Sequence, residues 1–272
     1  MSLQNKTIAF IGAGNMGEAL IRGLLGTRIV AAPQLIATDV RAERREFFAR
    51  TFAVRAIDDN PQAVKAADIV VLAVKPQQVG DVLAGLKSAM SNRKLVISIV
   101  AGVTTGRIER ELGKGTRVIR VMPNTPALVG AGAAAIAKGS QATEDDLATA
   151  ESILGAVGIC VRVEEKFIDA VTALSGSGPA YVFYVTEAMI KAGVAAGLDG
   201  PLAKKLAVQT VYGAAKLLVE SGEEPESLRR KVTSPGGTTE AALKVMTQRK
   251  LVEIFSEAMK AAEKRSQELS GS

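Results

Sequence analysis

Short apolar runs alternate with amphipathic segments along the first 160 residues of the chain. Ile69–Val74 is apolar at every position and Leu95–Ile99 is nearly so, which is typical of strands covered on both faces of a sheet. Further strands are predicted at Thr7–Ile11, Leu35–Thr38 and Val118–Val121, and helices at Asn15–Leu25, Ala42–Thr51 and Thr104–Leu112. Repeated strand–helix units predict a parallel sheet with right-handed crossovers, that is, a Rossmann-like, doubly wound α/β domain.

The pattern changes near residues 160–166. Strand patterns are almost absent after Val163, and prolines at 179, 201 and 225 stand near helix starts, where their missing N–H costs little. Helices are predicted at Lys166–Ala173, Pro179–Ala196, Pro201–Glu220, Pro225–Val232, Thr239–Met246 and Val252–Leu269. We predict an α/β domain over residues 1–162 and an all-α domain over residues 163–272.

The second of these domains has helices with long apolar faces. The apolar positions are Leu202, Leu206, Val208, Val211, Ala215 and Leu218. One small bundle would not cover faces of this extent comfortably, so we predict that the helices pack against a second subunit. A self-contained bundle is the alternative.

The composition is that of a globular protein, because 47% of the 272 residues are hydrophobic and 23% are charged. No apolar run approaches the ~18–20 residues that a membrane span needs. The first residues also lack the apolar stretch of a signal peptide. We therefore expect a cytoplasmic protein with no membrane segment.

The chain carries a net charge of +6, with Lys and Arg scattered along the predicted helices. Only Arg41–Arg50 and Arg229–Lys231 are locally dense in positive charge. Solvated helix faces explain most of this charge. A site for a small anionic ligand explains the rest at least as well as nucleic acid does, and no nucleic-acid partner is predicted.

Histidine is absent, and Cys160 is the only cysteine. This excludes a histidine base, Ser–His and Cys–His nucleophiles and the commonest metal ligand, and no metal site is predicted. Cys160 stands among apolar neighbours and is predicted to be a buried strand residue. Any chemistry must therefore use other polar side chains, the backbone or a cofactor.

A glycine-rich turn follows the first predicted strand and opens the first predicted helix. Its residues are Gly12, Ala13, Gly14, Asn15, Met16 and Gly17. In this pattern the first glycine permits a tight turn, the second lets the backbone approach a pyrophosphate, and the third permits close helix–strand packing. The helix N-terminus presents free N–H groups to the phosphates. We therefore predict that the first domain binds a dinucleotide.

Charged residues after the second predicted strand give conflicting signals about that cofactor. Asp39 ends the strand, and a carboxylate there commonly hydrogen-bonds the adenine ribose, which favours NAD. Arg41, Arg44 and Arg45 follow, and guanidinium groups suit the 2′-phosphate of NADP, although an exposed helix face would also explain them. NADP(H) is slightly favoured over NAD(H).

Three loops follow predicted strands and should lie at the carboxyl ends of the sheet, where ligands bind. They are Ala73-Val74-Lys75-Pro76, Ala101-Gly102 and Met122–Pro126. We predict that they line the cofactor cleft, with plain structural loops as the alternative.

Two motifs in the helical half place glycines and small hydroxyl residues near helix starts. They span residues 174–181 (LSGSGPAY) and 233–239 (TSPGGTT). Loops of this kind offer several N–H and hydroxyl donors, which suits a carboxylate. The first motif fits close helix packing better. For the second we predict a ligand loop, with helix capping by Thr238 or Thr239 as the alternative.

These motifs together resemble the pyrroline-5-carboxylate reductase family. The resemblance is carried by GAGNMG at 12–17, AVKP at 73–76, VMPNTPALV at 121–129, LSGSGPAYVF at 174–183 and VTSPGGTT at 232–239. It implies reduction of the cyclic imine 1-pyrroline-5-carboxylate to L-proline, the last step of proline biosynthesis, with hydride from NAD(P)H. It also implies a helical dimerisation domain and a homodimer, and such dimers often assemble into decamers.

The same resemblance implies particular site residues. The substrate-binding positions would be Glu165, Ser234, Gly236, Gly237 and Thr239. Cofactor contacts would come from Asn60, Ala73–Pro76 and Ala101–Gly102, beside the glycine turn, Asp39 and Arg41. Asp39 occupies a variable ribose-contact position, so the cofactor preference is not inherited. Lys231 stands where some members have Asn.

The chemistry of imine reduction is compatible with a chain that lacks histidine. It needs a hydride at carbon and a proton at nitrogen, and the protein contributes positioning and electrostatics. A protonated imine is already electrophilic. We therefore hypothesise that the Thr239 hydroxyl orients the nitrogen and relays a proton through water.

Two other functions fit the same plan. A β-hydroxyacid-type dehydrogenase or another imine reductase generally depends on a catalytic Lys or Asp in the helix between the domains, and Lys191 and Lys204 lie in no matching motif. A non-catalytic NAD(P)-sensing module would act through its dimer interface, and the intact substrate loops argue against it.

Overall fold

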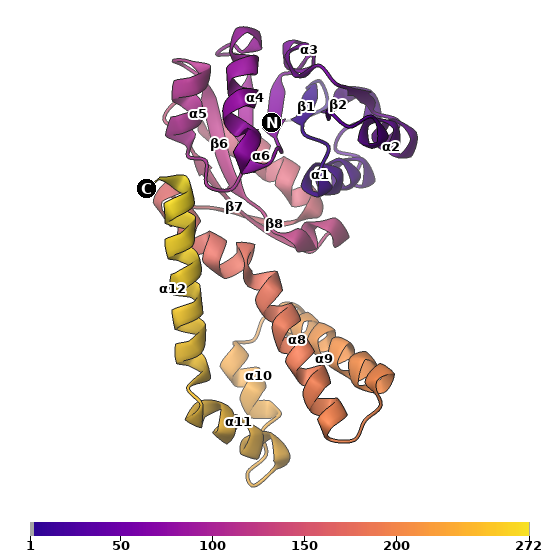
Figure 1. The fold of residues 1–272 in the computed structure, drawn as a ribbon, viewed down its shortest axis with the longest axis vertical. Helices are drawn as coiled ribbons and strands as arrows, with labels where there is room; N and C mark the ends of the chain where they lie inside the picture. Colours follow the sequence, from indigo (N-terminus) through magenta and orange to yellow (C-terminus); the bar gives the residue numbers. More distant parts are fainter. Residues whose placement is uncertain (1–2, 272) are drawn as a thin grey trace. The chain divides into compact units, whose positions relative to one another are not determined.

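The computed structural model describes residues 3–271 and divides into two compact units. Unit 1 comprises the chain up to Ser177 together with the segment from Ala262 onward, and unit 2 is Gly178–Ala261. Unit 1 is coloured from indigo to salmon in Figure 1, with the last turns of the yellow terminal helix. Each unit is described by itself.

Unit 1 is built on one sheet of eight strands, in the order β3-β2-β1-β4-β5-β6-β7-β8. The strands are β1 (Ile8–Ile11), β2 (Leu35–Thr38), β3 (Arg55–Ile57), β4 (Ile69–Leu72), β5 (Leu95–Ser98), β6 (Arg117–Met122), β7 (Gly132–Lys138) and β8 (Gly158–Arg162). All neighbouring pairs are parallel except β6 and β7. The chain order runs outward in both directions from β1 and β4, which creates the switch point of a doubly wound sheet.

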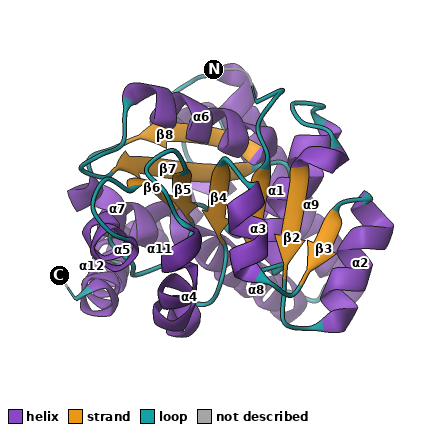
Figure 2. Ribbon diagram, turned by 90° about the horizontal axis from the view of Figure 1, so that it is seen from above, coloured by secondary structure: helices purple, strands orange, loops and turns teal. Residues whose placement is uncertain are grey.

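Helices cover both faces of this sheet (Figure 2). Those of unit 1 are α1 (Asn15–Gly26), α2 (Ala42–Phe52), α3 (Asn60–Ala66), α4 (Val79–Leu86), α5 (Thr105–Leu112), α6 (Glu144–Leu154) and α7 (Ile168–Val171). Short 3-10 turns lie at Ala32–Gln34, Pro76–Gln78, Lys87–Ala89, Thr125–Val129, Gly155–Val157 and Glu165–Phe167, and a π-helical turn at Thr172–Gly176. Helices α1, α2 and α6 pack on one face, and α3, α4 and α5 on the other.

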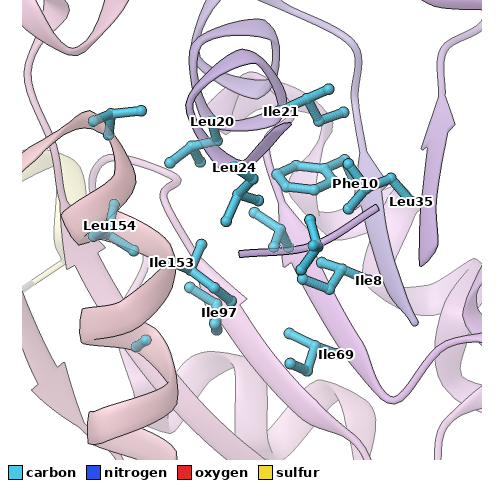
Figure 3. Packing of buried hydrophobic residues seen from close by; sticks show 14 of the residues in the cluster. Ile8, Phe10, Leu20, Ile21, Leu24, Leu35, Ile69, Ile97, Ile153 and Leu154 are labelled. Atoms are coloured by element: carbon cyan, nitrogen blue, oxygen red, sulfur yellow. The ribbon is translucent and has the colours of Figure 1, made fainter. Parts of the chain in front are cut away.

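Alternation along each strand divides the core between the two faces. Ile8 and Phe10 of β1 belong to the cluster with α1 and α6, whereas Ala9 and Ile11 belong to the cluster on the opposite face. Figure 3 shows Ile8, Phe10 and Leu24 in the first cluster. Because both faces are covered, strands such as β4 are apolar at every position, and the prediction of doubly covered strands is confirmed.

The antiparallel strand β7 was not predicted. Its sequence is Gly132–Lys138, which is rich in alanine and reads as neither a β-branched strand nor an amphipathic helix. It pairs antiparallel with β6 and parallel with β8, so the sheet is mixed rather than wholly parallel. Cys160 lies in β8 as predicted, but it is half-buried because β8 is the edge strand.

Unit 2 is entirely helical, as predicted for the second half of the chain. Its helices are α8 (Gly178–Ala195), α9 (Gly200–Ser221), α10 (Pro225–Lys231), α11 (Thr238–Gln248) and the first part of α12 (Leu251–Ser270). Helices α8 and α9 lie side by side (Figure 1). Leu206, Val208 and several other apolar residues of α9 are exposed within the chain.

The compact units do not divide the chain at residue 162. The first unit extends through α7 and the π-helical turn to Ser177, and the last residues of α12 return to it. The bounds 1–162 for a dinucleotide-binding domain and 163–272 for a helical dimerisation domain stay a prediction. Among residues 3–271 no helix combines the length and apolar character that crossing a membrane requires.

Candidate cofactor and substrate sites

The glycine turn between β1 and α1 has the geometry that its sequence predicts. Gly12 has a φ of +105°, and a Cβ there would lie 2.6 Å from the Ala73 carbonyl oxygen. A Cβ on Gly17 would lie 2.8 Å from the Gly12 carbonyl oxygen. Around Gly14 there is no atom within 4 Å of such a Cβ. Gly12 and Gly17 thus shape the turn, whereas Gly14 leaves open space where a pyrophosphate could approach the backbone.

A hollow of about 330 Å³ opens beside this turn. The residues that line it and were predicted from the sequence to contact the cofactor are Gly12, Gly14, Asp39, Arg41, Asn60, Ala73, Val74 and Lys75. The fold therefore brings together residues that are up to 63 positions apart in the sequence, at the carboxyl ends of β1, β2 and β4. Thr38, Val40, Asp58, Gln78 and Val82 also line it and were not predicted. Thr38, Val40 and Asp58 stand at or just after strand ends, whereas Gln78 and Val82 lie in the 3-10 turn and in α4 and have no such signal.

The Asp39 carboxylate is bound from two sides. It accepts a hydrogen bond from the Ala13 amide at 3.2 Å, from the Arg41 amide at 3.0 Å, and from the Arg41 guanidinium at 3.0 and 3.2 Å. Burial alone would raise the pKa of Asp39, but the hydrogen bonds from Arg41 and Ala13 outweigh it and hold the pKa below its ordinary value. The carboxylate therefore stays ionised and ties the glycine turn to the end of β2.

The three arginines after Asp39 have different environments. Arg44 donates to the Ala13 carbonyl at 2.8 Å and pairs with Glu18 at 3.0 Å. Arg45 donates to the carbonyls of Asp39 and Val40 and pairs with Asp58. Only the Arg41 side chain is more than half exposed. Arg41 is therefore the guanidinium best placed to meet a ligand in the hollow.

Asn60 is placed in the hollow by the start of α3. Its Oδ1 lies 2.5 Å from the Thr38 hydroxyl, which also lines the hollow. Asp59 caps the helix by accepting from the Gln62 amide at 2.8 Å. The local sequence thus starts the helix at the residue that faces the candidate ligand.

The remaining predicted cofactor residues lie around the hollow rather than on its wall. Ala13, Asn15, Met16, Gly17 and Pro76 are in the turn, in α1 or at the start of a 3-10 turn and do not line it. Ala101 and Gly102 follow β5, the next strand beyond β4. Gly102 has a φ of +70°, and Leu269 of α12 packs against it. This loop is thus at the carboxyl edge of the sheet, one strand beyond the hollow.

Asn124 has a structural role in the proline-rich loop after β6. Its side chain donates to the Ser175 carbonyl at 3.0 Å and accepts from the Ala133 amide at 2.8 Å. In the first glycine-rich motif, a Cβ on Gly176 would collide with the Met122 side chain. This close approach at Gly176 agrees with the packing role that the sequence favoured for the motif at residues 174–181.

Glu165, a predicted substrate residue, binds protein groups in this structure. Its carboxylate accepts from the Thr105 amide at 2.8 Å, the Thr105 hydroxyl at 2.5 Å and Arg120 at 3.2 Å. Its side chain is 28% exposed. The carboxylate thus binds the N-terminus of α5, and a substrate contact by Glu165 stays a prediction.

The loop at residues 233–239 turns sharply before α11 in unit 2. Gly236 has a φ of +72° and donates its amide to Glu240 at 2.8 Å, and the Gly237 amide donates to the Ser234 carbonyl at 3.0 Å. The N-cap of α11 is Gly237, so capping by Thr238 or Thr239 is not what this loop does. Glu240 was not predicted, although its position four residues after Gly236 is a recognisable signal.

A basic hollow of about 820 Å³ lies beside this loop within unit 2. It is lined by Arg229, Arg230, Thr233, Gly236, Gly237, Glu240, Ala241, Leu243, Lys244 and Thr247. Three of these side chains are cationic and one is a carboxylate, although Arg229 and Arg230 also pair with Glu226. The remaining positive charge favours a small anion such as a carboxylate. Within the described residues, no three His, Cys, Asp or Glu side chains are grouped to hold a metal ion.

The sheet order, the glycine turn and the hollow at the strand ends are those of a dinucleotide-binding protein of the Rossmann class. Residues 7–102 match a family model described as NADP oxidoreductase, coenzyme F420-dependent, and residues 165–269 match one described as pyrroline-5-carboxylate reductase dimerisation. The chain belongs to the pyrroline-5-carboxylate reductase family, and the resemblance seen in its sequence motifs is confirmed.

Relatives and solved structures match the whole chain. The chain is 45% identical to a pyrroline-5-carboxylate reductase of Synechocystis sp. over 99% of both chains, and 44% identical to one of Methanosarcina acetivorans over 98% and 99%. A solved pyrroline-5-carboxylate reductase of Coxiella burnetii superposes with a TM-score of 0.93 at 41% identity, over 98% of this chain and 99% of that one. A Plasmodium falciparum pyrroline carboxylate reductase with NADP bound gives 0.87 at 31% identity, with the same coverage.

Proposed function

We propose that the chain reduces 1-pyrroline-5-carboxylate to L-proline with NADPH or NADH, the last step of proline biosynthesis. The observation that carries the proposal is the 44–45% identity, over nearly the whole chain, to relatives named for this reaction. The site supports it independently. The space left by Gly14 and the polar lining of the adjacent hollow suit a dinucleotide.

A nicotinamide bound at this sheet edge would supply the hydride for the imine carbon, and the imine nitrogen would need a proton. The protein need not form a covalent bond to the substrate. Its contribution is to hold the two reactants in line and to bind the carboxylate and the nitrogen. This requires that the cofactor at unit 1 reach the loop at residues 234–239 of the same chain or of a second copy.

Ser234, Gly236 and Gly237 are proposed to bind the substrate carboxylate. Glu240 now accepts the Gly236 amide, so a bound carboxylate would take the place of the Glu240 carboxylate there. Positive charge from Arg229 and Lys244 in the same hollow favours an anionic ligand. Thr239, in the first turn of α11, is proposed to orient the imine nitrogen.

The proposed preference for NADPH rests on Arg41. Its exposed guanidinium lines the hollow beside Asp39, where it would bind a 2′-phosphate, whereas the ionised Asp39 would repel that phosphate. The balance is close, so we expect a modestly higher kcat/KM with NADPH than with NADH. Measuring both values under one condition decides the preference.

The helical half is proposed to form a homodimer, and five such dimers to form a decamer. The match of residues 165–269 to a dimerisation family model and the exposed apolar faces of unit 2 support the dimer. Sedimentation equilibrium at micromolar concentration tests both sizes. A cytoplasmic location stays a prediction, which cell fractionation tests.

The test is turnover of 1-pyrroline-5-carboxylate, followed by the loss of NADPH absorbance. Thr239→Ala should lower kcat/KM about 10–100-fold, the scale of a lost positioning hydrogen bond. Thr186→Ala is the matched control, because that hydroxyl lies in α8, does not line the hollow and donates to the Val182 carbonyl at 2.7 Å.

Other outcomes point to other functions. Unchanged kinetics in Thr239→Ala would refute the role of that hydroxyl while leaving the reaction itself established. Turnover of small 2- or 3-hydroxy acids instead of the imine would indicate a β-hydroxyacid-type dehydrogenase. Cofactor binding with no turnover on any imine would indicate a sensing module.

A further inference from the structure

Buried polar groups from three distant segments meet beneath the loop that follows β5. Arg120 of β6 is 4% exposed, Asp169 of α7 is 8% exposed and Ser266 of α12 is 6% exposed. The Ser266 hydroxyl donates to Asp169 Oδ1 at 2.6 Å, and Arg120 Nη2 lies 3.9 Å from the same oxygen. Arg120 Nη1 donates to Glu165 Oε1 at 3.2 Å. Arg120 therefore joins two carboxylates that are otherwise separate.

Glu165 carries this connection to the loop between β5 and α5. Both of its oxygens accept from Thr105, one from the amide and one from the hydroxyl. Thr105 is the first residue of α5, where a carboxylate is favoured by the free N–H groups and the helix dipole. The end of the loop at residues 100–104 is therefore fixed by Glu165, and Glu165 is fixed by Arg120.

The other side of the same loop is held by the C-terminal turn of α12. A Cβ on Gly102 would lie 3.1 Å from the Leu269 carbonyl oxygen, so the helix backbone packs directly against the loop. Ser266, one turn earlier in α12, is anchored to Asp169. Both supports of the loop thus converge on Arg120, one through Glu165 and the other through Asp169 and Ser266.

We infer that Arg120 is a positioning residue for hydride transfer, which keeps the Ala101–Gly102 loop in place beside the nicotinamide. The inference rests on the proposed function, in which this loop flanks the cofactor. Arg120 itself does not touch the reacting atoms. Its guanidinium fork suits two carboxylates at once, which a lysine would bind less well.

The sequence provides a matched control on the same strand. Arg117 is three residues earlier in β6 and pairs with the buried Asp146 at 2.7 Å, with a further hydrogen bond to the Arg93 carbonyl. Replacing either arginine with methionine leaves a buried carboxylate without its cation, which destabilises the fold in both cases. Only Arg120 is connected to the loop at residues 100–104.

The experiment compares Arg120→Met with Arg117→Met, at a temperature well below both unfolding midpoints. We expect kcat/KM for 1-pyrroline-5-carboxylate to fall about 10–100-fold in Arg120→Met, since a small displacement of a positioning element has effects of this size. In Arg117→Met the same kcat/KM should fall less than about threefold. Arg120→Lys should recover part of the loss. Affinity for adenosine 2′,5′-bisphosphate, which carries only the adenine half of NADPH, should stay unchanged in all three.

Equal kcat/KM in Arg120→Met and Arg117→Met would overturn the inference, because the cluster would then contribute to stability alone. If Arg120→Met does not fold, Ser266→Ala replaces it, with the exposed neighbour Arg265→Ala as its control. Ser266→Ala should lower kcat about threefold or more, and no difference from Arg265→Ala would overturn the inference.

Failure of the proposed function is distinguishable from failure of this inference. If the unmodified protein does not reduce the imine, the proposed function fails. Titration with NADPH and with the bisphosphate still tests the inference in that case. If Arg120→Met binds NADPH more weakly than the unmodified protein does but binds the bisphosphate equally well, positioning of the loop is supported. If the affinities for both probes are unchanged, or fall by the same factor, the inference is contradicted.

Discussion

The two compact units bury their apolar side chains to very different degrees. Strands β1, β2, β4 and β5 of unit 1 are buried at every position. In unit 2, α8 has no fully buried residue, and Phe183 and Tyr184 are 62% and 72% exposed. The sheet has both of its faces covered by helices of the same unit, whereas unit 2 lacks a second layer of its own.

This difference shows where the chain depends on another copy of itself. Unit 1 has the double core of an independent domain. Unit 2 exposes many large apolar side chains, among them Leu206, Tyr212 and Val219, in the region that matches a dimerisation family model. Its stability should therefore depend on protein concentration, whereas that of unit 1 should not.

The largest effect should come from a charge on the apolar face of α9. Leu206 is half-exposed within the chain, and in a dimer that covers it Leu206→Asp would bury an unpaired carboxylate. We expect a loss of about 3 kcal/mol or more in dimer stability, so that the variant sediments as a monomer at micromolar concentration.

Lys205→Asp is the matched control, because it places the same new side chain on the adjacent, polar position of α9. It should leave the dimer intact. If both variants dissociate to the same extent, or neither does, the comparison between the units is wrong. In that case the exposed face of unit 2 does not form the subunit contact.

Smaller effects, which differ between the two positions, should follow from alanine substitutions at Gly12 and Gly14 of unit 1. Gly12→Ala forces a positive φ and a collision with Ala73, so it should lower the free energy of unfolding by about 1–3 kcal/mol at every protein concentration. Gly14→Ala meets no atom and should leave stability unchanged, but its methyl group would occupy the space proposed for the pyrophosphate.

Denaturant unfolding and NADPH titration of both variants measure this separation. Gly14→Ala should weaken NADPH about 100-fold, roughly 2.7 kcal/mol, without moving the unfolding midpoint. If Gly14→Ala binds NADPH as tightly as the unmodified protein does, the glycine turn does not contact the cofactor. Concentration-dependent unfolding of Gly12→Ala would show that unit 1 is not self-contained.

The smallest effect is a pH dependence at the edge of unit 1. Burial raises the pKa of the Cys160 thiol to about 11, from an ordinary 9.0. The contribution to stability is therefore complete below pH 9 and is lost as pH rises toward 11, because the unfolded chain loses the proton first. Stability should fall more steeply over that range in the unmodified protein than in Cys160→Ala. If the free energy of unfolding falls equally with pH in both proteins, the Cys160 thiol in β8 is exposed to water.

Much of the architecture followed from local patterns in the sequence. The doubly covered strands such as β4, the turn at Gly12–Gly17 and the change to helices after Val163 were all predicted. These features depend on neighbouring residues, whose spacing and backbone freedom are visible in the chain itself. The strand β7 was missed because alanines have no strong preference, and its antiparallel direction is decided by its partners β6 and β8.

The candidate site was predicted in the same uneven way. Most residues that line the hollow, such as Gly12, Asp39 and Ala73, were predicted from the glycine turn and from positions at strand ends, and Asn60 was predicted from the family resemblance. The sequence did not predict which of these residues are free to meet a ligand and which are bound to other side chains. Arg41, Arg44 and Arg45 all follow Asp39 within six positions. Only the structure shows that Arg44 and Arg45 are largely buried beside Glu18 and Asp58, whereas the Arg41 side chain is more than half exposed.

The sequence by itself therefore determined the elements, the glycine turn and the family, since each of these depends on short-range geometry or on motifs in order along the chain. Only the tertiary structure decided which polar groups meet. Ser266 and Asp169 are 97 positions apart, and Glu165 and Thr105 are 60 apart, yet each pair forms a hydrogen bond. Such contacts have no local signature, because a buried polar group takes whichever partner the packed fold brings within reach.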